Sequence, residues 1–248
     1  MRAEWEAKTA WVWRLRNNIS QPEVPLPRRV IELHSNLMDF LADSVAIKLA
    51  KSVRIQRVPH PKIELCQFKK FLTPEHCEQL ITLIDKDRRP STIADPNGDD
   101  YFRTSETCDL RRVEPVVQKL DGVLHDLNGI DPALAEPVQG QRNDVGQEFK
   151  AHTDYFTPGT ADFEKFCSDT GQRTWTFMIY LNKVEAGGAT RFKVVGKTFQ
   201  PEIGKLVCWN NKRPNGELNP NTLHHGMKVR KGMKYVITKW YRERPWPW

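Results

Sequence analysis

The stretch Thr174-Trp175-Thr176-Phe177-Met178-Ile179-Tyr180-Leu181 combines β-branched, aromatic and aliphatic residues, a composition that is typical of a buried strand. Residues 205–209 and 234–241 have a similar composition. Gly187-Gly188 marks a turn after the first of these stretches. We therefore predict β structure from residue 140 to the end of the chain.

Before residue 140, apolar residues recur at helical spacing. This pattern covers residues 27–50 and 114–127, and Thr73-Pro74 has the cap and first-turn residues of a helix that continues to Ile84. Residues 63–68 alternate like a strand. Helices followed by many short strands predict an α+β fold whose core is an antiparallel sandwich or barrel.

The length of 248 residues allows one catalytic domain with an extension. We place the domain at residues 56–248 and a helical extension at residues 1–55. Trp5, Trp11 and Trp13 give this extension an apolar surface. That surface would either pack on the domain or associate with a second copy of the chain, so a homo-oligomer is one of two arrangements that the sequence allows.

Three features bear on location. No apolar run approaches the roughly 18 residues of a membrane span, and Glu4 and Glu6 interrupt the pattern of a secretory leader. The five cysteines are scattered and form no CxxC pair, which is typical of reduced thiols. We expect a cytoplasmic protein without a membrane partner.

The formal net charge is +7. A basic surface can concentrate nucleic acids or acidic substrates. However, lysine and arginine alternate with acids through most of the chain, and only residues 228–244 are markedly basic. This distribution favours an ordinary globular surface over a nucleic-acid partner.

His152 and Asp154 are separated by one residue, so in an extended chain their side chains leave the same face. Downstream, His224 and His225 supply further imidazoles. Two histidines and one carboxylate at three corners of an ion form the facial arrangement of non-haem iron(II) oxygenases. A solvated surface pair is the alternative for His152 and Asp154 taken alone.

Further motifs accompany these residues in a definite order. They are Phe102-Arg103-Thr104-Ser105, Gly146-Gln147-Glu148-Phe149, His152-Thr153-Asp154-Tyr155-Phe156 and residues 176–182, 185–188, 223–226, 232–235 and 238–240. Over roughly residues 60–244 they resemble the prolyl 4-hydroxylase branch of the iron(II)/2-oxoglutarate oxygenases. The resemblance implies a double-stranded β-helix, a jelly-roll barrel with supporting helices.

The resemblance also implies the catalytic site. In that family the last metal-binding histidine precedes the oxoacid-binding lysine by ten positions, which selects His224 and Lys234. His152, Asp154 and His224 are then the catalytic metal ligands, and Lys234 binds the distal carboxylate of 2-oxoglutarate. Strand parity agrees, because His225 would face the opposite side of the strand from His224.

Two more residues are implied to contact the oxoacid. Thr176 matches a hydroxyl that helps to hold the same carboxylate, although an ordinary strand threonine is the alternative. Asn143 stands nine residues before His152, where many prolyl hydroxylases carry a tyrosine. Because an amide is shorter but still donates a hydrogen bond, we expect oxoacid binding to be rearranged there.

The implied cofactors are Fe(II), 2-oxoglutarate as cosubstrate and O2, with ascorbate to restore over-oxidised iron. Asp154 favours hydroxylation, because related halogenases lack a ligand at that corner of the iron. Zinc is the competing metal, but the cysteines typical of structural zinc are missing from the motif.

The sequence leaves the substrate open. A prolyl residue of a peptide or protein is the leading hypothesis, a free amino acid or small metabolite is the alternative, and nucleic-acid demethylation is a remoter one. A binding protein without activity would usually have lost a metal ligand. Trp240 and Phe149 are the candidate substrate contacts, although Trp240 could equally fill the barrel core.

Residues 155–173 form a long segment directly after the first two metal ligands. They include Phe156, Phe163 and Phe166 as well as turn residues. We predict that this segment helps to select the substrate. A fixed surface excursion is the alternative.

Overall fold

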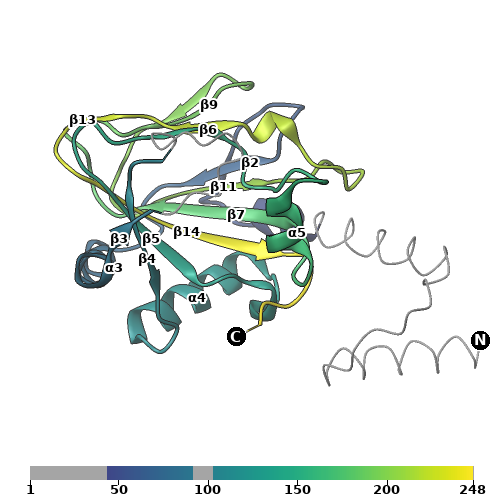
Figure 1. Cartoon of the computed structure of the whole chain (residues 1–248), viewed down its shortest axis with the longest axis horizontal. Helices are drawn as coiled ribbons and strands as arrows, with labels where there is room; N and C mark the ends of the chain where they lie inside the picture. The colour runs from purple at the N-terminus through teal and green to yellow at the C-terminus, as the bar shows by residue number, and fades with distance from the viewer. Residues whose placement is uncertain (1–43, 92–102, 248) are drawn as a thin grey trace, which may run out of the picture. The chain divides into compact units, whose positions relative to one another are not determined.

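An eight-stranded antiparallel sheet forms the centre of the fold (Figure 1). The structure is a computed structural model that describes residues 44–91 and 103–247. In spatial order the strands are β1 (Gln56–Arg57), β2 (Leu65–Phe68), β11 (Lys205–Asn210), β7 (Arg173–Tyr180), β14 (Lys234–Arg242), β5 (Val138–Asn143), β4 (Glu106–Leu110) and β3 (Arg89–Pro90). The strands predicted at residues 63–68, 174–181, 205–209 and 234–241 are therefore confirmed to within two residues.

A smaller sheet faces the large one (Figure 1). Its strands are β10 (Lys197–Phe199), β9 (Thr190–Phe192), β12 (His224–Gly226) and β6 (Phe149–His152). A separate pair is formed by β13 (Val229–Lys231) and β8 (Ala186–Gly187). Between the sheets, Met178 and Tyr180 pack with Phe192 and Trp209 in one apolar cluster. This arrangement confirms the predicted jelly-roll fold.

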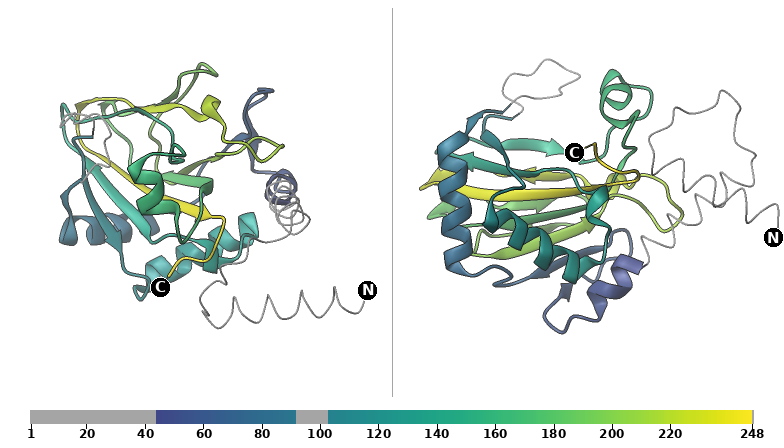
Figure 2. Two further views of the ribbon diagram at one scale, coloured as in Figure 1. Left: turned by 45° about the vertical axis from the view of Figure 1, so that its right-hand side comes forward. Right: turned by 90° about the horizontal axis from the view of Figure 1, so that it is seen from below.

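Two helices contribute to the second apolar cluster, on the other side of β7. They are α3 (Pro74–Asp87) and α4 (Pro115–Asn128), which Figure 2 shows from two further directions. Phe177 and Ile179 of β7 belong to this cluster, whereas Met178 and Tyr180 belong to the cluster between the sheets. Because β7 is buried on both faces from Trp175 to Tyr180, its sequence there is mostly apolar and does not alternate between apolar and charged residues.

The ends of the elements follow local rules. The Thr73 hydroxyl accepts a hydrogen bond from the backbone N–H of His76 at 3.4 Å, and Pro74 occupies the first turn of α3, as predicted. Gly187 and Gly188 have φ values of 79° and 70°, a region that glycine adopts at little cost. Short 3-10 helices η1 (Pro132–Leu134) and η2 (Pro220–Thr222) precede β5 and β12.

Only the last part of the predicted N-terminal extension is described. Residues 44–50 are helical, and Val45 and Leu49 are buried in the cluster that contains α3 and α4. The remainder of the predicted helix over residues 27–50 lies outside the described residues, as do Trp5, Trp11 and Trp13. In the part of the chain that is described, no helix is both long and apolar enough to cross a membrane.

The long segment after Asp154 is folded. It contains a helix, α5 (Ala161–Cys167), which is capped by the hydroxyl of Thr160. The rings of Phe156 and Phe166 stack with their centroids 5.2 Å apart. The guanidinium of Arg244 donates hydrogen bonds to the carbonyls that end α5. This segment is therefore tied to the C-terminal end of the chain, and its role in substrate selection stays a prediction.

Candidate active site

Three potential metal ligands meet at the smaller sheet. His152 on β6 is directly paired with His224 on β12, and Asp154 follows β6. The Nε2 atoms of His152 and His224 lie 3.7 and 3.9 Å from Oδ1 of Asp154. One ligand atom of each residue lies within 4.8 Å of the others. The structure thus brings together the three predicted ligands in an arrangement suited to one ion.

Hydrogen bonds orient each ligand toward that common centre. Nδ1 of His152 lies 2.7 Å from the carbonyl of Lys150, and Nδ1 of His224 lies 3.0 Å from the carbonyl of Thr222. A carbonyl only accepts, so Nδ1 carries the proton in both rings and Nε2 presents a lone pair to the centre. Such outer contacts are typical of metal-binding histidines.

The protonation states also suit a metal. Burial and the neighbouring His224 together lower the pKa of His152 to about 3, although Asp154 acts in the opposite direction. Burial raises the pKa of Asp154, but His224, His152 and Arg173 outweigh this effect and bring it below the usual value. A neutral imidazole and an ionised carboxylate are the forms that bind Fe(II).

His225 faces away from this centre. It is paired with Arg191 on β9, and its Nε2 lies 2.8 Å from Oε2 of Glu148. The structure therefore places His224, and not His225, among the three ligands, in agreement with the parity argument.

The triad opens onto a cavity of about 40 Å³ that Lys234 also lines. Lys234 is buried, and burial lowers its pKa to about 8. No carboxylate forms an ion pair with Lys234 among the described residues. A buried ammonium without an anion is costly, so this position fits the carboxylate of a bound oxoacid. Asn143 is the cross-strand partner of Lys234 and lines the same cavity.

The pKa of Lys234 predicts a pH dependence of oxoacid binding. Its ammonium loses the proton above about pH 8, rather than above 10.5, when no anion is bound. We therefore expect the affinity for 2-oxoglutarate to fall as the pH rises through 8, by up to about tenfold per unit. Calorimetric titration of the Mn(II)-loaded protein between about pH 7 and 9.5 measures this. A constant affinity over that range would contradict it.

Thr176 does not have its predicted role. It is paired with Trp240, whereas Lys234 lies six residues earlier on the same strand, about 20 Å away. One five-carbon oxoacid carboxylate cannot contact both residues. Instead, the Thr176 hydroxyl donates to Oδ2 of Asp154 at 2.7 Å, and Nδ2 of Asn211 donates to that hydroxyl at 2.9 Å. Thr176 thus orients a metal ligand and does not hold the oxoacid.

Replacing Thr176 by valine tests this correction. The Thr176→Val variant should bind Fe(II) or Co(II) about 10- to 100-fold more weakly, because Asp154 loses its orienting donor. The affinity for 2-oxoglutarate of the metal-saturated protein should change much less. Thr198→Val is the matched control on the exposed face of β10. Loss of oxoacid affinity without loss of metal affinity would restore the original assignment.

Both candidate substrate contacts line the cavity. The Phe149 ring stacks on His152 with a centroid separation of 3.5 Å. Trp240 is 7% exposed, and its indole Nε1 has no hydrogen-bond partner among the described residues. The guanidinium of Arg173 lies 3.8 Å from the Trp240 ring centroid. That these two aromatic residues contact substrate stays a prediction.

Sequence reasoning did not single out the polar residues around Trp240. Glu136 binds Arg173 through hydrogen bonds of 2.6 and 2.8 Å and also lies 2.6 Å from Nε of Arg242. Asn211, which supports Thr176, is fully buried. Isolated arginine, glutamate and asparagine residues form no motif with a fixed spacing in the sequence. Their hydrogen-bond partners are 35 or more residues away along the chain. No local signal could have identified them.

Comparisons with known proteins agree with this site. Residues 138–242 match the family model of the 2OG-Fe(II) oxygenase superfamily. The chain is 32% identical to the prolyl 4-hydroxylase subunit alpha-1 of Gallus gallus over 188 residues, which cover 74% of this chain and 36% of that protein. It is 31% identical to prolyl 4-hydroxylase 5 of Arabidopsis thaliana over 198 residues, or 70% of this chain and 66% of that one. The chain thus spans about a third of the alpha-1 subunit.

Solved structures show the same fold. The viral collagen prolyl hydroxylase vCPH of Paramecium Bursaria Chlorella virus-1, in complex with 2OG, has a TM-score of 0.55 at 26% identity and covers 72% of this chain and 94% of its own. A Pseudomonas putida prolyl-4-hydroxylase shares the fold with a TM-score of 0.52 at 18% identity, covering 82% and 99%.

Fe(II), 2-oxoglutarate and O2 are the cofactors of this family, and the site fits them. His152, Asp154 and His224 would hold the metal, and Lys234 would hold the oxoacid. The chain therefore belongs to the 2OG-Fe(II) oxygenase superfamily, as a prolyl 4-hydroxylase-like member.

Proposed function

We propose that this chain hydroxylates a prolyl residue of a peptide or protein with Fe(II), 2-oxoglutarate and O2. The observation that carries the proposal is the convergence of His152, Asp154, His224 and Lys234 on one cavity. Identity of 29 to 32% to several prolyl 4-hydroxylases supports the choice of substrate.

Different side chains have different roles in catalysis. Fe(II) with 2-oxoglutarate and O2 supplies the conversion of an unactivated C–H bond to an alcohol, with succinate and carbon dioxide as the other products. Lys234 binds the distal carboxylate of the oxoacid. Thr176 and Asn211 hold Asp154 in its orientation. The apolar residues between the sheets exclude water from the reacting groups.

Trp240 provides a contact suited to a peptide. A buried N–H without an acceptor costs free energy, and a ligand that supplies an acceptor recovers it. A peptide carbonyl beside the target residue is such an acceptor. The Arg173 guanidinium, 3.8 Å from the ring centroid, packs over the indole and holds it in place.

Peptides with a single proline test the proposal. Incubation with Fe(II), 2-oxoglutarate and ascorbate should release succinate and add one oxygen atom to the prolyl residue, which mass spectrometry measures. Free L-proline and a methylated oligonucleotide serve as the alternative substrates. Oxidation of either of these, with no change in any peptide, would reject the proposal.

Replacing Trp240 by phenylalanine removes the indole N–H and keeps an aromatic ring. We expect Trp240→Phe to raise KM for the peptide about tenfold, because one hydrogen bond to substrate is lost. Succinate production without peptide should stay close to that of the unaltered chain. An unchanged KM would show that Trp240 only fills the core.

A further inference from the structure

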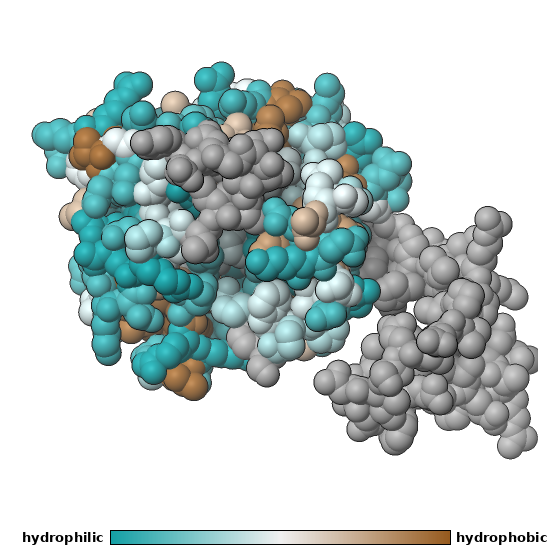
Figure 3. Space-filling view, viewed as in Figure 1, coloured by the Kyte–Doolittle hydropathy of each residue, from teal (hydrophilic) through white to brown (hydrophobic). Residues whose placement is uncertain are grey.

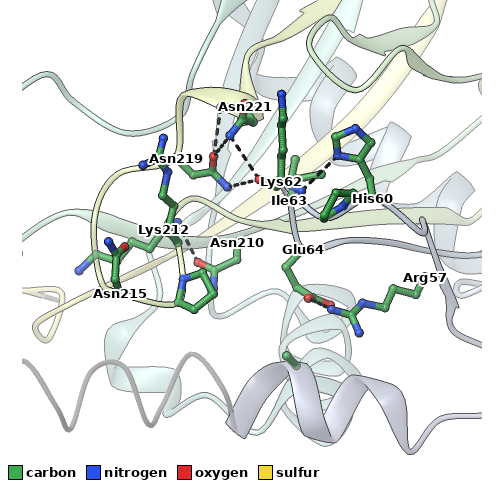
Figure 4. Close-up of a pocket in the computed structure, with 14 residues that line it drawn as sticks. Arg57, His60, Lys62, Ile63, Glu64, Asn210, Lys212, Asn215, Asn219 and Asn221 are labelled. Atoms are coloured by element: carbon green, nitrogen blue, oxygen red, sulfur yellow. Dashed lines mark hydrogen bonds and ion pairs between the residues drawn. The ribbon is translucent and has the colours of Figure 1, made fainter.

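A second and larger cleft lies at the ends of β2 and β11 (Figure 4). Its volume is about 700 Å³, within the range of ligand sites. Residues from 57–64 and from 210–221 face each other across it. On the face in Figure 3, by contrast, apolar residues are isolated among hydrophilic ones. None of the cofactors of the proposed reaction accounts for this cleft.

Cationic side chains predominate in the lining. Lys62, Arg57, Lys212 and Arg213 line the cleft with His60, whereas Glu64 is the one carboxylate of the lining. Glu64 pairs with Arg57, and acids outside the lining pair with Lys212 and Arg213. The ammonium of Lys62 is exposed and has no ion pair among the described residues. An anionic group of a ligand could form an ion pair with the Lys62 ammonium.

Amide groups add further donors. Oδ1 of Asn210 accepts from the backbone N–H of Lys212, and Oδ1 of Asn215 accepts from the backbone N–H of Glu217. Each interaction uses the oxygen and leaves the amide NH2 without an acceptor among the described residues. Because donors exceed acceptors, the cleft suits a ligand rich in carboxylate and carbonyl oxygens.

Asn219 connects this cleft with the metal site. Its Nδ2 donates to the carbonyl of Lys62 at 2.9 Å, and its backbone N–H donates to the carbonyl of Asn211. Its own carbonyl accepts from the hydroxyl of Thr222 at 2.8 Å. Asn211 supports Asp154 through Thr176, and Thr222 orients His224. The segment from Asn219 to Thr222 therefore lines the cleft on one side. On its other side it helps to position the metal ligands Asp154 and His224.

The cleft and Trp240 lie at the same end of the large sheet. On β7, Trp175 is paired with Asn210 of β11. The next residue of β7, Thr176, is paired with Trp240 of β14. Two strand spacings separate β11 from β14, about 10 Å, which an extended chain crosses in about three residues. Because the Asn210 side chain leaves the opposite face of the sheet from Trp209 and Trp240, a polypeptide at the metal site would reach the cleft around this end of the sheet, with residues close to its target.

We propose that this cleft binds an acidic segment that flanks the hydroxylated residue of a polypeptide substrate. The proposal rests on the proposed function, which it extends to the sequence around the target. The lining contains no Phe, Tyr or Trp side chain on which a base could stack, so the chemistry fits an acidic polypeptide better than a nucleic acid.

Direct binding provides the first test. Fluorescein-labelled hexaglutamate should raise the anisotropy signal with the full chain, and labelled hexaglutamine should bind at least about tenfold more weakly. Lys62→Glu should weaken hexaglutamate binding about tenfold, since an attraction at roughly 5 Å in water becomes a repulsion of equal size. Lys193→Glu, the same change at an exposed site outside the cleft, should alter it less than about twofold.

Catalysis provides the second test. For a single-proline peptide with glutamates about three to five positions from the proline, Lys62→Glu should raise KM and leave kcat unchanged. For the same peptide with alanines in their place, neither constant should change. Succinate release without peptide serves as the check that the metal site is intact.

The outcomes separate the two proposals. If proline peptides are hydroxylated but neither hexaglutamate binding nor KM depends on Lys62, the cleft proposal fails and the proposed function stands. If hexaglutamate binds through Lys62 but no proline peptide is oxidised, the proposed function fails. Tighter binding of free citrate, or of an oligonucleotide with the same Lys62 dependence, would overturn the assignment to an acidic polypeptide.

Discussion

Alanine at His152, Asp154 or His224 is expected to reduce 2-oxoglutarate turnover to the background of the assay. Each substitution removes one of the three ligands that the described residues bring together, whose donor atoms lie within 4.8 Å of one another. Two remaining ligands would bind Fe(II) weakly and would not hold it opposite Lys234. Succinate release measures the loss, and Co(II) titration shows whether it arises from the metal.

His225→Ala is the matched control for this series. His225 is the neighbour of His224, but it bonds Glu148 on the other face of the strand. This variant should retain a substantial part of the turnover and bind Co(II) with nearly unchanged affinity. An inactive His225→Ala together with an active His224→Ala would show that the ligand assignment is wrong by one residue.

Lys234→Ala should weaken 2-oxoglutarate binding by about tenfold to a hundredfold. A hydrogen bond to a charged group contributes about 1.5 to 3 kcal/mol, which corresponds to that change in affinity. Metal affinity should change little, because Lys234 is not one of the three metal ligands. Calorimetry with 2-oxoglutarate and with Mn(II) measures the two affinities separately.

Lys234→Met is the control that distinguishes a loss of oxoacid binding from a folding defect. Methionine keeps most of the apolar length of the buried lysine side chain and removes only its charge. It should reproduce the loss of oxoacid affinity in a protein whose thermal transition is unchanged or raised, since a buried ammonium is costly. Normal 2-oxoglutarate affinity in a folded Lys234→Met variant would remove Lys234 from the site.

Much of the fold could be predicted because its signals are local. The run from Thr174 to Leu181 is apolar because β7 is buried on both faces, and Thr73-Pro74 caps α3 through contacts within one turn. The order of helices and strands then limits the architecture to a few packed arrangements. Helix α5 contradicts the β structure predicted after residue 140, and the individual strands between residues 186 and 199 were not delimited, since each of these elements is too short to show a period.

The metal ligands were also accessible from local spacing. A strand alternates its side chains, so His152 and Asp154 share a face and His224 is distinguished from His225. The resemblance to the prolyl 4-hydroxylase branch then implied that Lys234, ten residues after His224, is the oxoacid partner, and the structure puts both residues on one cavity. Thr176 was assigned wrongly, because its contacts depend on cross-strand register, which the sequence does not contain.

The sequence by itself predicted strands after residue 140 and placed His152 and Asp154 on one strand face, because strand parity and residue spacing act along the chain. Its resemblance to the prolyl 4-hydroxylase branch implied the jelly-roll class, His224 as the third ligand and Lys234 as the oxoacid partner. Only the tertiary structure decided that Thr176 and Asn211 hold Asp154, that the Trp240 N–H has no partner among the described residues, and that residues 57–64 meet residues 210–221 in a cleft. These contacts join residues that are 22 to 157 positions apart. The pairing and packing of strands bring them together, and no local pattern of residue types specifies such a meeting.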